Sequence, residues 1–419
     1  MYALVINGGR PLEGEVRVSG AKNAVLPLMA AALLTREPCA IRGVPKLSDV
    51  AFMGRILTSL GATVRFQDGT VTIQASRIRG VGQYDLVRKM RASICIMGPL
   101  LARLGKAQVS YPGGCVIGPR PIDLHLKGMK VLGADVAIDQ GYVYLKAQGL
   151  RGAPIFLGGR AGPTVLGTAN VMMAATLAEG TTVIDCAACE PEVTDLAHFL
   201  TAMGAQINGV GSPTLTITGV RELHGATHEV IPDRIEAATF AIAAAATKGD
   251  VTLTHVRPDH LRSVLDKLRE VGIAVVENGT RLTVRSDGQF RPSDVTTQPY
   301  PGFPTDVQAQ MTVLMTQADG FSIITERIFE SRFMHVSELG RFGARIGIEG
   351  PSAVVKGPTP LRGAPVMASD LRASAALVIA GLIAEGVTNV RRIYHIDRGY
   401  EAIDTKLKAL GARVRRISE

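Results

Sequence analysis

The chain has 419 residues and a net charge of +9; 46% of the residues are hydrophobic, 5% are aromatic and none is Trp. A chain of this length usually divides into two domains, and its apolar runs of about ten residues are half of what a membrane-spanning helix needs. Few aromatic residues, and basic residues that stand singly in loops, argue against a nucleic-acid surface and favour a pocket for a small, highly charged anion.

The first twenty residues predict two short strands around a turn. After them, two phrases recur six times each: an apolar helix rich in small residues that leads into a strand, and an amphipathic helix that ends at a glycine before another strand. The apolar helices with their strands fall within residues 27–44, 93–111, 169–186, 238–256, 308–326 and 375–393. The glycines are Gly61, Gly133, Gly204, Gly272, Gly343 and Gly411, spaced 68 to 72 residues apart. Six copies of a unit of about seventy residues predict an α/β protein with three repeats in each of two domains.

Polar residues precede the apolar helix in every copy. They are Lys22 and Asn23, Arg91 to Ser93, Pro163 and Thr164, Asp233 to Glu236, Thr305 to Gln308, and Asp370 to Ser374. Ser, Thr and Asp are ordinary helix caps, and acidic groups favour the positive end of the helix dipole. Cations such as Lys22, Arg91, Arg234 and Arg372 oppose that dipole, so they indicate an anion bound between them and the helix N–H groups.

A second set of polar residues follows the strand after each apolar helix. It includes Lys46, Cys115, Arg120, Asp123, His125, Glu190, Glu192, Arg332 and Arg398. Equivalent loops in a symmetric array of repeats lie at the same end of the array. We therefore expect both sets of polar residues to face one cleft between the two groups of three repeats.

Cys115 differs from the other cysteines in its surroundings. It follows Gly113 and Gly114 in a loop rich in Pro and Gly, five residues before Arg120, whereas Cys95 lies in an apolar run typical of a packing residue. Neighbouring cations favour the thiolate, which is the reactive form of cysteine. The sequence therefore makes Cys115 a candidate reactive thiol.

The five cysteines are scattered along the chain and predict no disulfide framework, which favours a reducing, cytoplasmic location. Cys186 and Cys189 form a single CxxC, for which a metal or redox role and simple packing are alternatives. Packing is favoured because the sequence has no second pair and no histidine at metal-binding spacing. We expect no metal and no cofactor.

Several segments resemble one family of enzymes. They are residues 19–34 (SGAKNAVLPLMAAALL), 112–125 (PGGCVIGPRPIDLH), 232–240 (PDRIEAATF), 303–310 (FPTDVQAQ), 329–336 (FESRFMHV), 370–386 (DLRASAALVIAGLIAEG) and 393–401 (IYHIDRGYE). Together they resemble the UDP-N-acetylglucosamine 1-carboxyvinyltransferases, the enolpyruvyl transferases that open bacterial peptidoglycan precursor synthesis. The similarity runs from Asn7 to the last predicted strand.

The resemblance implies a two-domain, inside-out α/β barrel whose apolar helices lie inside shells of strands. The first domain would span residues 21–231, with the loop that holds Cys115, and the second would span residues 1–20 and 232–419. The family transfers the enolpyruvyl group of phosphoenolpyruvate to the 3′-hydroxyl of UDP-N-acetylglucosamine and releases phosphate through a tetrahedral intermediate. The partners would be these two small molecules in the cytoplasm, with no nucleic acid and no membrane, and the oligomeric state stays open.

The resemblance also implies roles for individual residues. Lys22, Asn23, Arg120, Arg332, Arg372 and Arg398 would bind phosphoenolpyruvate. Asn23, Arg91, Arg120, Pro121, Ile122, Asp123, Leu124, Thr164, Val165, Thr305, Asp306, Ile328 and Phe329 would bind the UDP-sugar. Cys115, Asp306, Lys22 and Arg398 would be catalytic, with Asp306 as the general base and Cys115 as the thiol that fosfomycin alkylates.

One segment departs from the family, and other functions stay open. The family commonly reads Ser-Val-Gly-Ala-Thr before the third apolar helix, where this chain has TVLGT at 164–168. Leu166 stands in place of a backbone-permissive Gly, which leaves open the preference for N-acetylglucosamine over a related UDP-sugar. The alternatives are a shikimate-pathway enolpyruvyl transferase, an RNA-processing or RNA-binding protein, and a non-catalytic sensor of a UDP-sugar.

Overall fold

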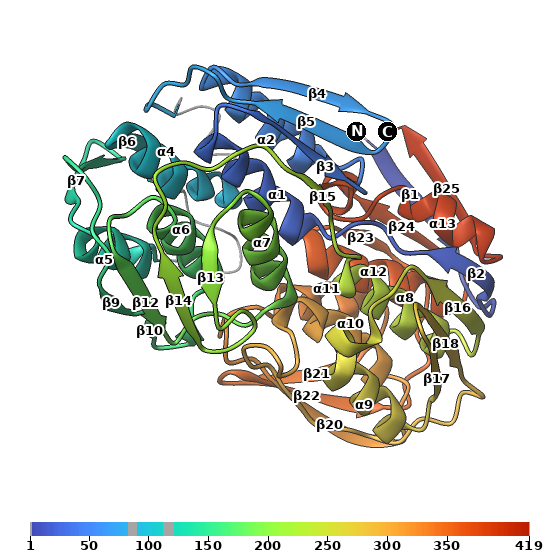
Figure 1. Cartoon of the computed structure of the whole chain (residues 1–419). Helices are drawn as coiled ribbons and strands as arrows, with labels where there is room; N and C mark the ends of the chain where they lie inside the picture. Colours follow the sequence, from blue (N-terminus) through green and yellow to red (C-terminus); the bar gives the residue numbers. More distant parts are fainter. Residues whose placement is uncertain (1, 83–89, 112–120, 419) are drawn as a thin grey trace. The chain divides into compact units, whose positions relative to one another are not determined.

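The computed structural model describes residues 2–82, 90–111 and 121–418, which form two compact units (Figure 1). Within these ranges, the first unit consists of residues 20–231 and the second unit of residues 2–19 and 232–418. No helix in the described ranges is both long enough and apolar enough to cross a membrane.

The apolar helices of the repeats are the inner helices of both units. In the first unit they are α1 (Lys22–Ala31) with η1 (Ala32–Leu34), η2 (Arg91–Ile96) with α4 (Met97–Leu104), and α6 (Val165–Ala175). In the second unit they are α8 (Arg234–Ala246), η4 (Thr305–Val307) with α10 (Gln308–Met315), and α12 (Leu371–Ile383). Every residue of α8 after Arg234 is buried, and so is every residue of α12 from Arg372 to Leu382. Burial on all sides confirms the inside-out arrangement.

The amphipathic helices bury one face and end at the predicted glycines. They are α2 (Ser48–Ser59), α5 (Asp123–Val131), α7 (Pro191–Ala202), α9 (Arg262–Val271), preceded by η3 (Pro258–Leu261), α11 (Met334–Arg341) and α13 (Ile403–Ala409), preceded by η5 (Ile393–Arg398). The six glycines that follow them have φ between +90° and +105°, a left-handed conformation that a residue with a Cβ adopts at a cost. The helix ends predicted from the sequence are therefore confirmed.

In the first unit the sheets run in the orders β15-β3-β5-β4, β6-β8-β7 and β13-β14-β12-β9, beside a small hairpin of β10 and β11. Their strands are β3 (Pro38–Arg42), β4 (Thr63–Gln67), β5 (Thr70–Gln74), β6 (Lys106–Ser110), β7 (Asp135–Asp139), β8 (Tyr142–Lys146), β9 (Pro154–Phe156), β10 (Gly158–Gly159), β11 (Gly162–Pro163), β12 (Thr181–Asp185), β13 (Gln206–Asn208), β14 (Thr214–Thr218) and β15 (Thr227–Glu229). Buried and exposed positions alternate along strands such as β5 and β12, as they do in a sheet that covers a core with one face.

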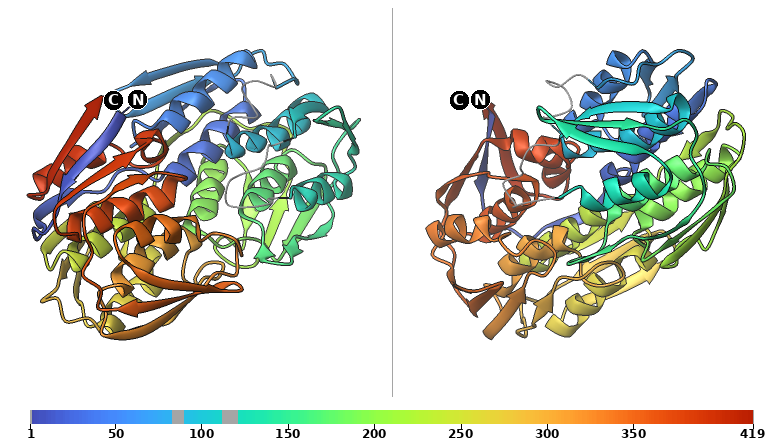
Figure 2. Two further views of the ribbon diagram at one scale, coloured as in Figure 1. Left: turned by 180° about the vertical axis from the view of Figure 1, so that it is seen from behind. Right: turned by 90° about the vertical axis from the view of Figure 1, so that its left-hand side faces the viewer.

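In the second unit the orders are β17-β18-β16-β2, β19-β20-β22-β21 and β23-β24-β1-β25. The strands are β1 (Tyr2–Asn7), β2 (Glu13–Arg17), β16 (Asp250–Thr254), β17 (Ala274–Asn278), β18 (Arg281–Arg285), β19 (Val295–Thr296), β20 (Gly320–Thr325), β21 (Arg345–Glu349), β22 (Ser352–Gly357), β23 (Pro365–Met367), β24 (Val387–Arg391) and β25 (Arg413–Ser418). Strand β1 pairs antiparallel with both β24 and β25, and β2 lies parallel to β16. The N-terminal strands therefore complete two sheets of the second unit, and the views in Figure 2 show sheets outside and helices inside within each unit.

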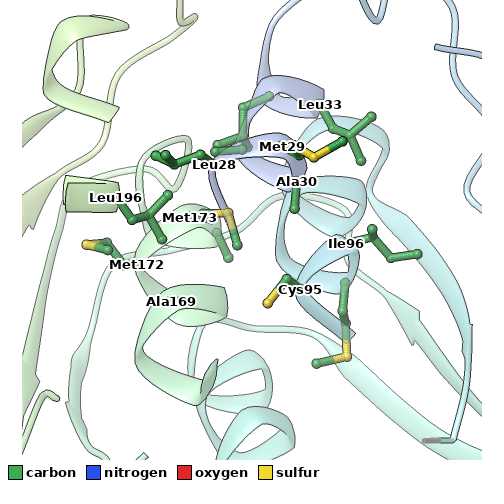
Figure 3. Packing of buried hydrophobic residues seen from close by; sticks show 14 of the residues in the cluster. Leu28, Met29, Ala30, Leu33, Cys95, Ile96, Ala169, Met172, Met173 and Leu196 are labelled. Atoms are coloured by element: carbon green, nitrogen blue, oxygen red, sulfur yellow. The ribbon is translucent and has the colours of Figure 1, made fainter. Parts of the chain in front are cut away.

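The core of the first unit is formed where the inner helices meet (Figure 3). Met29 of α1, Cys95 and Ile96 of η2, and Met172 and Met173 of α6 are completely buried there. Flexible, unbranched methionines fill irregular gaps between closely packed helices. Cys95 is a packing residue, as its apolar run predicts.

A polar side chain inside this core links three helices. Asn170 of α6 is completely buried. Its Oδ1 accepts from the backbone N–H of Gly98 (2.9 Å), and its Nδ2 donates to the carbonyl of Ile94 (3.1 Å) and contacts Nδ1 of His125 (3.0 Å). These bonds join α6 to the second inner helix and to the outer helix α5, so Asn170 fixes how the helices pack.

We expect Asn170→Ala to destabilise the protein, because it leaves the buried groups that bind Asn170 without this partner, at about 1–3 kcal/mol for each such group. The matched control is Thr201→Ala on the exposed side of α7, which should change stability by less than about 0.5 kcal/mol. Urea unfolding followed by circular dichroism measures both variants. Equal unfolding midpoints for the two would contradict the role assigned to Asn170.

Candidate functional site

In the second unit a carboxylate at the N-terminal end of an inner helix lies between two arginines. Asp306 belongs to η4, Arg372 is the second residue of α12, and Arg332 lies in the loop between β20 and α11. Nη1 of Arg332 is 2.9 Å from Oδ1 of Asp306, and Nη2 of Arg372 is 3.0 Å from Oδ2. The side chain of Asp306 is 25% exposed, against 9% for Arg332 and 3% for Arg372. Solvent therefore reaches the carboxylate more readily than the guanidinium groups.

The two arginines decide the charge of Asp306. Burial alone would raise its pKa, but the charges of Arg372 and Arg332 and their hydrogen bonds outweigh burial and hold the pKa well below its usual range. Burial alone would lower the pKa of Arg372, yet the charge of Asp306 raises it above its usual value. The sequence favoured an ionised Asp306 because of the helix dipole, whereas in the structure the guanidinium groups are the cause.

The ring of Tyr400 packs against the guanidinium group of Arg372. The Cζ atom of Arg372 lies 5.4 Å from the centre of the buried Tyr400 ring. The Tyr400 hydroxyl is 2.9 Å from Oγ1 of Thr239 in α8, and Nε2 of Gln310 in α10 donates to Thr239 (3.0 Å) and to Tyr400 (3.4 Å). Sequence reasoning missed this residue, although it stands two residues after Arg398, which is half-buried at the end of η5.

Thr305 joins the arginine cluster to the loop after β20. Its hydroxyl accepts from Nη1 of Arg332 (3.0 Å) and donates to Oε2 of Glu326 (2.8 Å). In the same loop, the Phe329 ring centre lies 5.8 Å from Cζ of Arg332, next to Ile328. The second unit thus brings together these predicted site residues: Thr305, Asp306, Phe329, Arg332 and Arg372.

In the first unit another ion pair stands at the start of an inner helix. Lys22 begins α1, and its Nζ lies 2.8 Å from Oδ2 of Asp49, in the first turn of α2. The two side chains are 10% and 8% exposed, while the neighbouring Asn23 is exposed. Sequence reasoning identified Lys22 and Asn23 but missed Asp49, although it belongs to a loop of the second polar set.

Apart from Asn23, the described residues of the first unit that are predicted to bind the UDP-sugar lie at the starts of η2, α5 and α6. Nη2 of Arg91 donates to the carbonyl of Pro121 (3.2 Å), directly before α5. Ile122 is buried, while Asp123, the first residue of α5, is exposed. A Cβ added to Gly159 would lie 3.0 Å from Leu124, so the hairpin of β10 and β11 packs closely against the start of α5.

Thr164 caps α6: its Oγ1 accepts from the backbone N–H of Gly167 (3.2 Å), and Val165 beside it is exposed. A Cβ at Gly167 would meet the Thr164 side chain at 2.3 Å, so a larger residue at that position would displace the capping side chain. Leu166 lies within the regular helix and is half-buried. The glycine that this turn needs is therefore at 167, and Leu166 does not disturb the cap.

Cys115 and Arg120 lie outside the described residues. The described cysteines are free, and burial raises the pKa of Cys39, of Cys95 (to about 12) and of Cys189. Within the described ranges, no group of three or more His, Cys, Asp or Glu residues could hold a metal ion.

Comparisons with known proteins agree on one family. The family model of EPSP synthase (3-phosphoshikimate 1-carboxyvinyltransferase) matches residues 6–407. A relative from Methylacidiphilum infernorum named UDP-N-acetylglucosamine 1-carboxyvinyltransferase is 55% identical over 417 residues, covering 100% of this chain and 99% of the relative. A relative of the same name from Koribacter versatilis is 53% identical and covers 100% of this chain and 97% of the relative.

Solved structures support the same conclusion. The crystal structure of the enolpyruvyl transferase NikO from Streptomyces tendae matches with a TM-score of 0.91 and 28% identity, covering 100% of this chain and 99% of that chain. An EPSP synthase from Acinetobacter baumannii, 17% identical with a TM-score of 0.74 and complete coverage of both chains, shares the fold. The fold and family predicted from the sequence are confirmed: the chain belongs to the UDP-N-acetylglucosamine 1-carboxyvinyltransferase family of enolpyruvyl transferases.

Proposed function

We propose that this protein transfers the enolpyruvyl group of phosphoenolpyruvate to the 3′-hydroxyl of UDP-N-acetylglucosamine and releases phosphate, the first committed step of peptidoglycan precursor synthesis. The observation that carries this assignment is the identity of 52–55% over the full length to relatives named for this activity. The ionised Asp306 between two buried arginines supports it, because the reaction needs a base beside cations that can hold a compact anion. The full-length relatives named for the UDP-sugar reaction also favour it over the shikimate-pathway and RNA-binding alternatives.

The proposed contacts follow from the family. Phosphoenolpyruvate is bound by Lys22, Asn23, Arg120, Arg332, Arg372 and Arg398. The UDP-sugar is bound by Asn23, Arg91, Arg120 to Leu124, Thr164, Val165, Thr305, Asp306, Ile328 and Phe329. The division into two compact units supports the two-domain organisation proposed from the family, and the free thiols of the described cysteines support a reducing, cytoplasmic location.

The addition step moves two protons, and the elimination step returns them. Asp306 accepts the proton of the 3′-hydroxyl as this oxygen bonds to C2 of phosphoenolpyruvate, while a general acid, for which we propose the Cys115 thiol, protonates C3. The C2–O bond to phosphate then breaks in the tetrahedral intermediate, the Cys115 thiolate takes a proton back from C3 to restore the double bond, and the proton held by Asp306 goes to the departing phosphate, so both groups regain their starting states. The arginines and Lys22 stabilise the negative charge that moves onto the departing phosphate.

The ion pairs explain how a weak base becomes active. While Arg332 and Arg372 are both paired with Asp306, its carboxylate has a depressed pKa and little affinity for a proton. An anionic substrate offers Arg332 and Arg372 another partner, and each N–H group taken away from Asp306 raises its pKa towards the range of a general base. Binding of phosphoenolpyruvate thus prepares the carboxylate for the step that it performs.

The assignment is tested by incubating the protein with phosphoenolpyruvate and UDP-N-acetylglucosamine and measuring phosphate release. Shikimate 3-phosphate is the control acceptor. We expect release with the UDP-sugar and none with the control. Binding of the UDP-sugar without turnover would favour the non-catalytic sensor, and turnover with the control acceptor would favour the shikimate-pathway enzyme.

Asp306→Asn keeps the shape of the side chain and removes its basicity. We expect turnover to fall by about 10²–10⁴ while the UDP-sugar still binds, because general-base catalysis contributes a factor of this size. The control is Asp250→Asn, which removes the carboxylate of an exposed Asp–Arg pair in β16 and should leave turnover unchanged. Turnover of Asp306→Asn at the wild-type rate would exclude Asp306 as the base.

Asp306→Asn also tests the ion pairs with Arg332 and Arg372, through its effect on the free energy of unfolding. Because the folded-state pKa of Asp306 is depressed, its stabilising effect is complete above the unfolded pKa of about 4 and is lost as the pH falls towards the folded pKa. Breaking a fully buried pair costs about 3–5 kcal/mol, and the cost is smaller here because Asp306 is 25% exposed. In urea unfolding, the gap between wild type and Asp306→Asn should stay constant from about pH 8 to 5 and shrink below about pH 4. A gap that widens at low pH would contradict the pairing.

Cys115 should be the cysteine that fosfomycin modifies. Burial raises the pKa of Cys39 and Cys95, and partial burial raises that of Cys189, so their thiolates are scarce at neutral pH. Mass spectrometry of peptides from the treated protein, with and without UDP-sugar, locates the adduct. An adduct on another cysteine, or none at all, would remove Cys115 from the mechanism.

A further inference from the structure

Glu326 is a completely buried acid at the end of β20, and the sequence did not single it out. Its Oε1 accepts from the hydroxyl of Thr297 (2.7 Å) and from the backbone N–H groups of Ile328 (2.8 Å) and Phe329 (3.0 Å). Its Oε2 accepts from the hydroxyl of Thr305 (2.8 Å). One side chain therefore holds both η4 and the loop after β20.

A carboxylate in this place is costly for the fold. Among the residues that the structure describes, no Lys, Arg or His lies within ion-pair distance of Glu326, and its side chain binds neutral hydroxyl and N–H groups. A buried charge compensated by neutral donors alone is less favourable than an amide or an apolar side chain of the same size. Stability by itself does not explain why an acid occupies this position.

The carboxylate does, however, impose a direction on every hydrogen bond around it. A carboxylate only accepts, so the Thr305 hydroxyl must donate its proton to Glu326 and keep its lone pairs for Nη1 of Arg332, 3.0 Å away. The same nitrogen donates to Asp306 (2.9 Å). The chain of bonds therefore runs from Glu326 through Thr305 and Arg332 to Asp306.

We propose that Glu326 is a positioning residue for the UDP-sugar: it holds Thr305, Ile328 and Phe329 in binding geometry, and through Arg332 it orients the Asp306 carboxylate. This inference rests on the proposed function, since it assigns these residues to the UDP-sugar contacts. Glu326 itself touches no substrate in this account. It acts through the groups that it holds.

Glu326→Gln tests the direction of the bonds. The amide oxygen of the new side chain can still accept from the N–H groups of Ile328 and Phe329. Its NH2 group, however, is a donor, so the Thr305 hydroxyl can no longer donate its proton to residue 326. We expect the Kd of UDP-N-acetylglucosamine, measured by calorimetry without phosphoenolpyruvate, to rise about 10-fold. Glu326→Ala, which also frees both backbone N–H groups, should raise it by about 100-fold.

A double-mutant cycle shows whether Glu326 acts through Thr305. Thr305→Val keeps the shape and removes the hydroxyl, so adding Glu326→Gln to Thr305→Val should change the Kd by less than about twofold. If Glu326→Gln does not fold, Thr297→Val disturbs the carboxylate at its other oxygen, and we expect a rise in Kd of about threefold. Full additivity in the cycle, or an unchanged Kd for Thr297→Val in that case, would overturn the proposal.

The control for a merely structural effect is Leu282→Ala in β18, a completely buried residue of another sheet. It should lower the unfolding midpoint without changing the Kd, because its strand belongs to a different sheet from β20. An equal rise in Kd for Leu282→Ala, or a wild-type Kd for folded Glu326→Gln, would refute the positioning role. Phosphate release by the wild-type protein separates the two hypotheses. If the wild type releases no phosphate, the proposed function is refuted. If it releases phosphate but the Glu326 variants bind the UDP-sugar with the wild-type Kd, only the Glu326 proposal is refuted.

Discussion

The burial of the inner helices on all sides is the constraint on which the rest of the structure depends. A surrounded helix has no solvent-facing side for charged residues, so helices such as α8 and α12 are built from Ala, Ile, Leu and Val, and their charged residues stand in the first turn. Polar groups deeper in the helices, such as Asn170 and Gln310, bind a neighbouring helix or a buried hydroxyl. The chemistry of the protein is therefore concentrated where the inner helices begin.

Cations close to the positive ends of helix dipoles are electrostatically unfavourable, and here paired carboxylates compensate their charge. Lys22 is paired with Asp49, and Arg332 and Arg372 are paired with Asp306. These pairs make the cationic groups tolerable in a buried setting, and in the proposed reaction the anionic substrate competes with the carboxylates for the same N–H groups. One arrangement thus stabilises the free protein and keeps the proposed base inactive until its substrate is present.

The second unit is assembled from both ends of the chain. In β20-β22-β21 the central strand and one neighbour form a local hairpin, whereas in β23-β24-β1-β25 the strand beside β24 and β25 is the N-terminal strand. Ladders between residues so far apart in sequence close late, because the loop entropy is lost before the contacts form. The first unit, by contrast, is a continuous stretch of the chain, so its own contacts can form without the termini.

The sequence by itself determined the repeat, the helix ends and the division into inner and outer helices, because periodicity, capping and glycine conformation are local properties of the chain. The six glycines and the polar residues before the inner helices follow from such local rules. Which acid meets which cation was decided by the tertiary structure alone: Asp306 and Arg372 are 66 residues apart, and no local pattern marks Asp49, Glu326 or Tyr400 as their supports. The turn before α6 shows the same limit, since the need for glycine at 167 comes from the contact with the Thr164 side chain. Long-range partners are chosen by packing, and packing is a property of the whole fold.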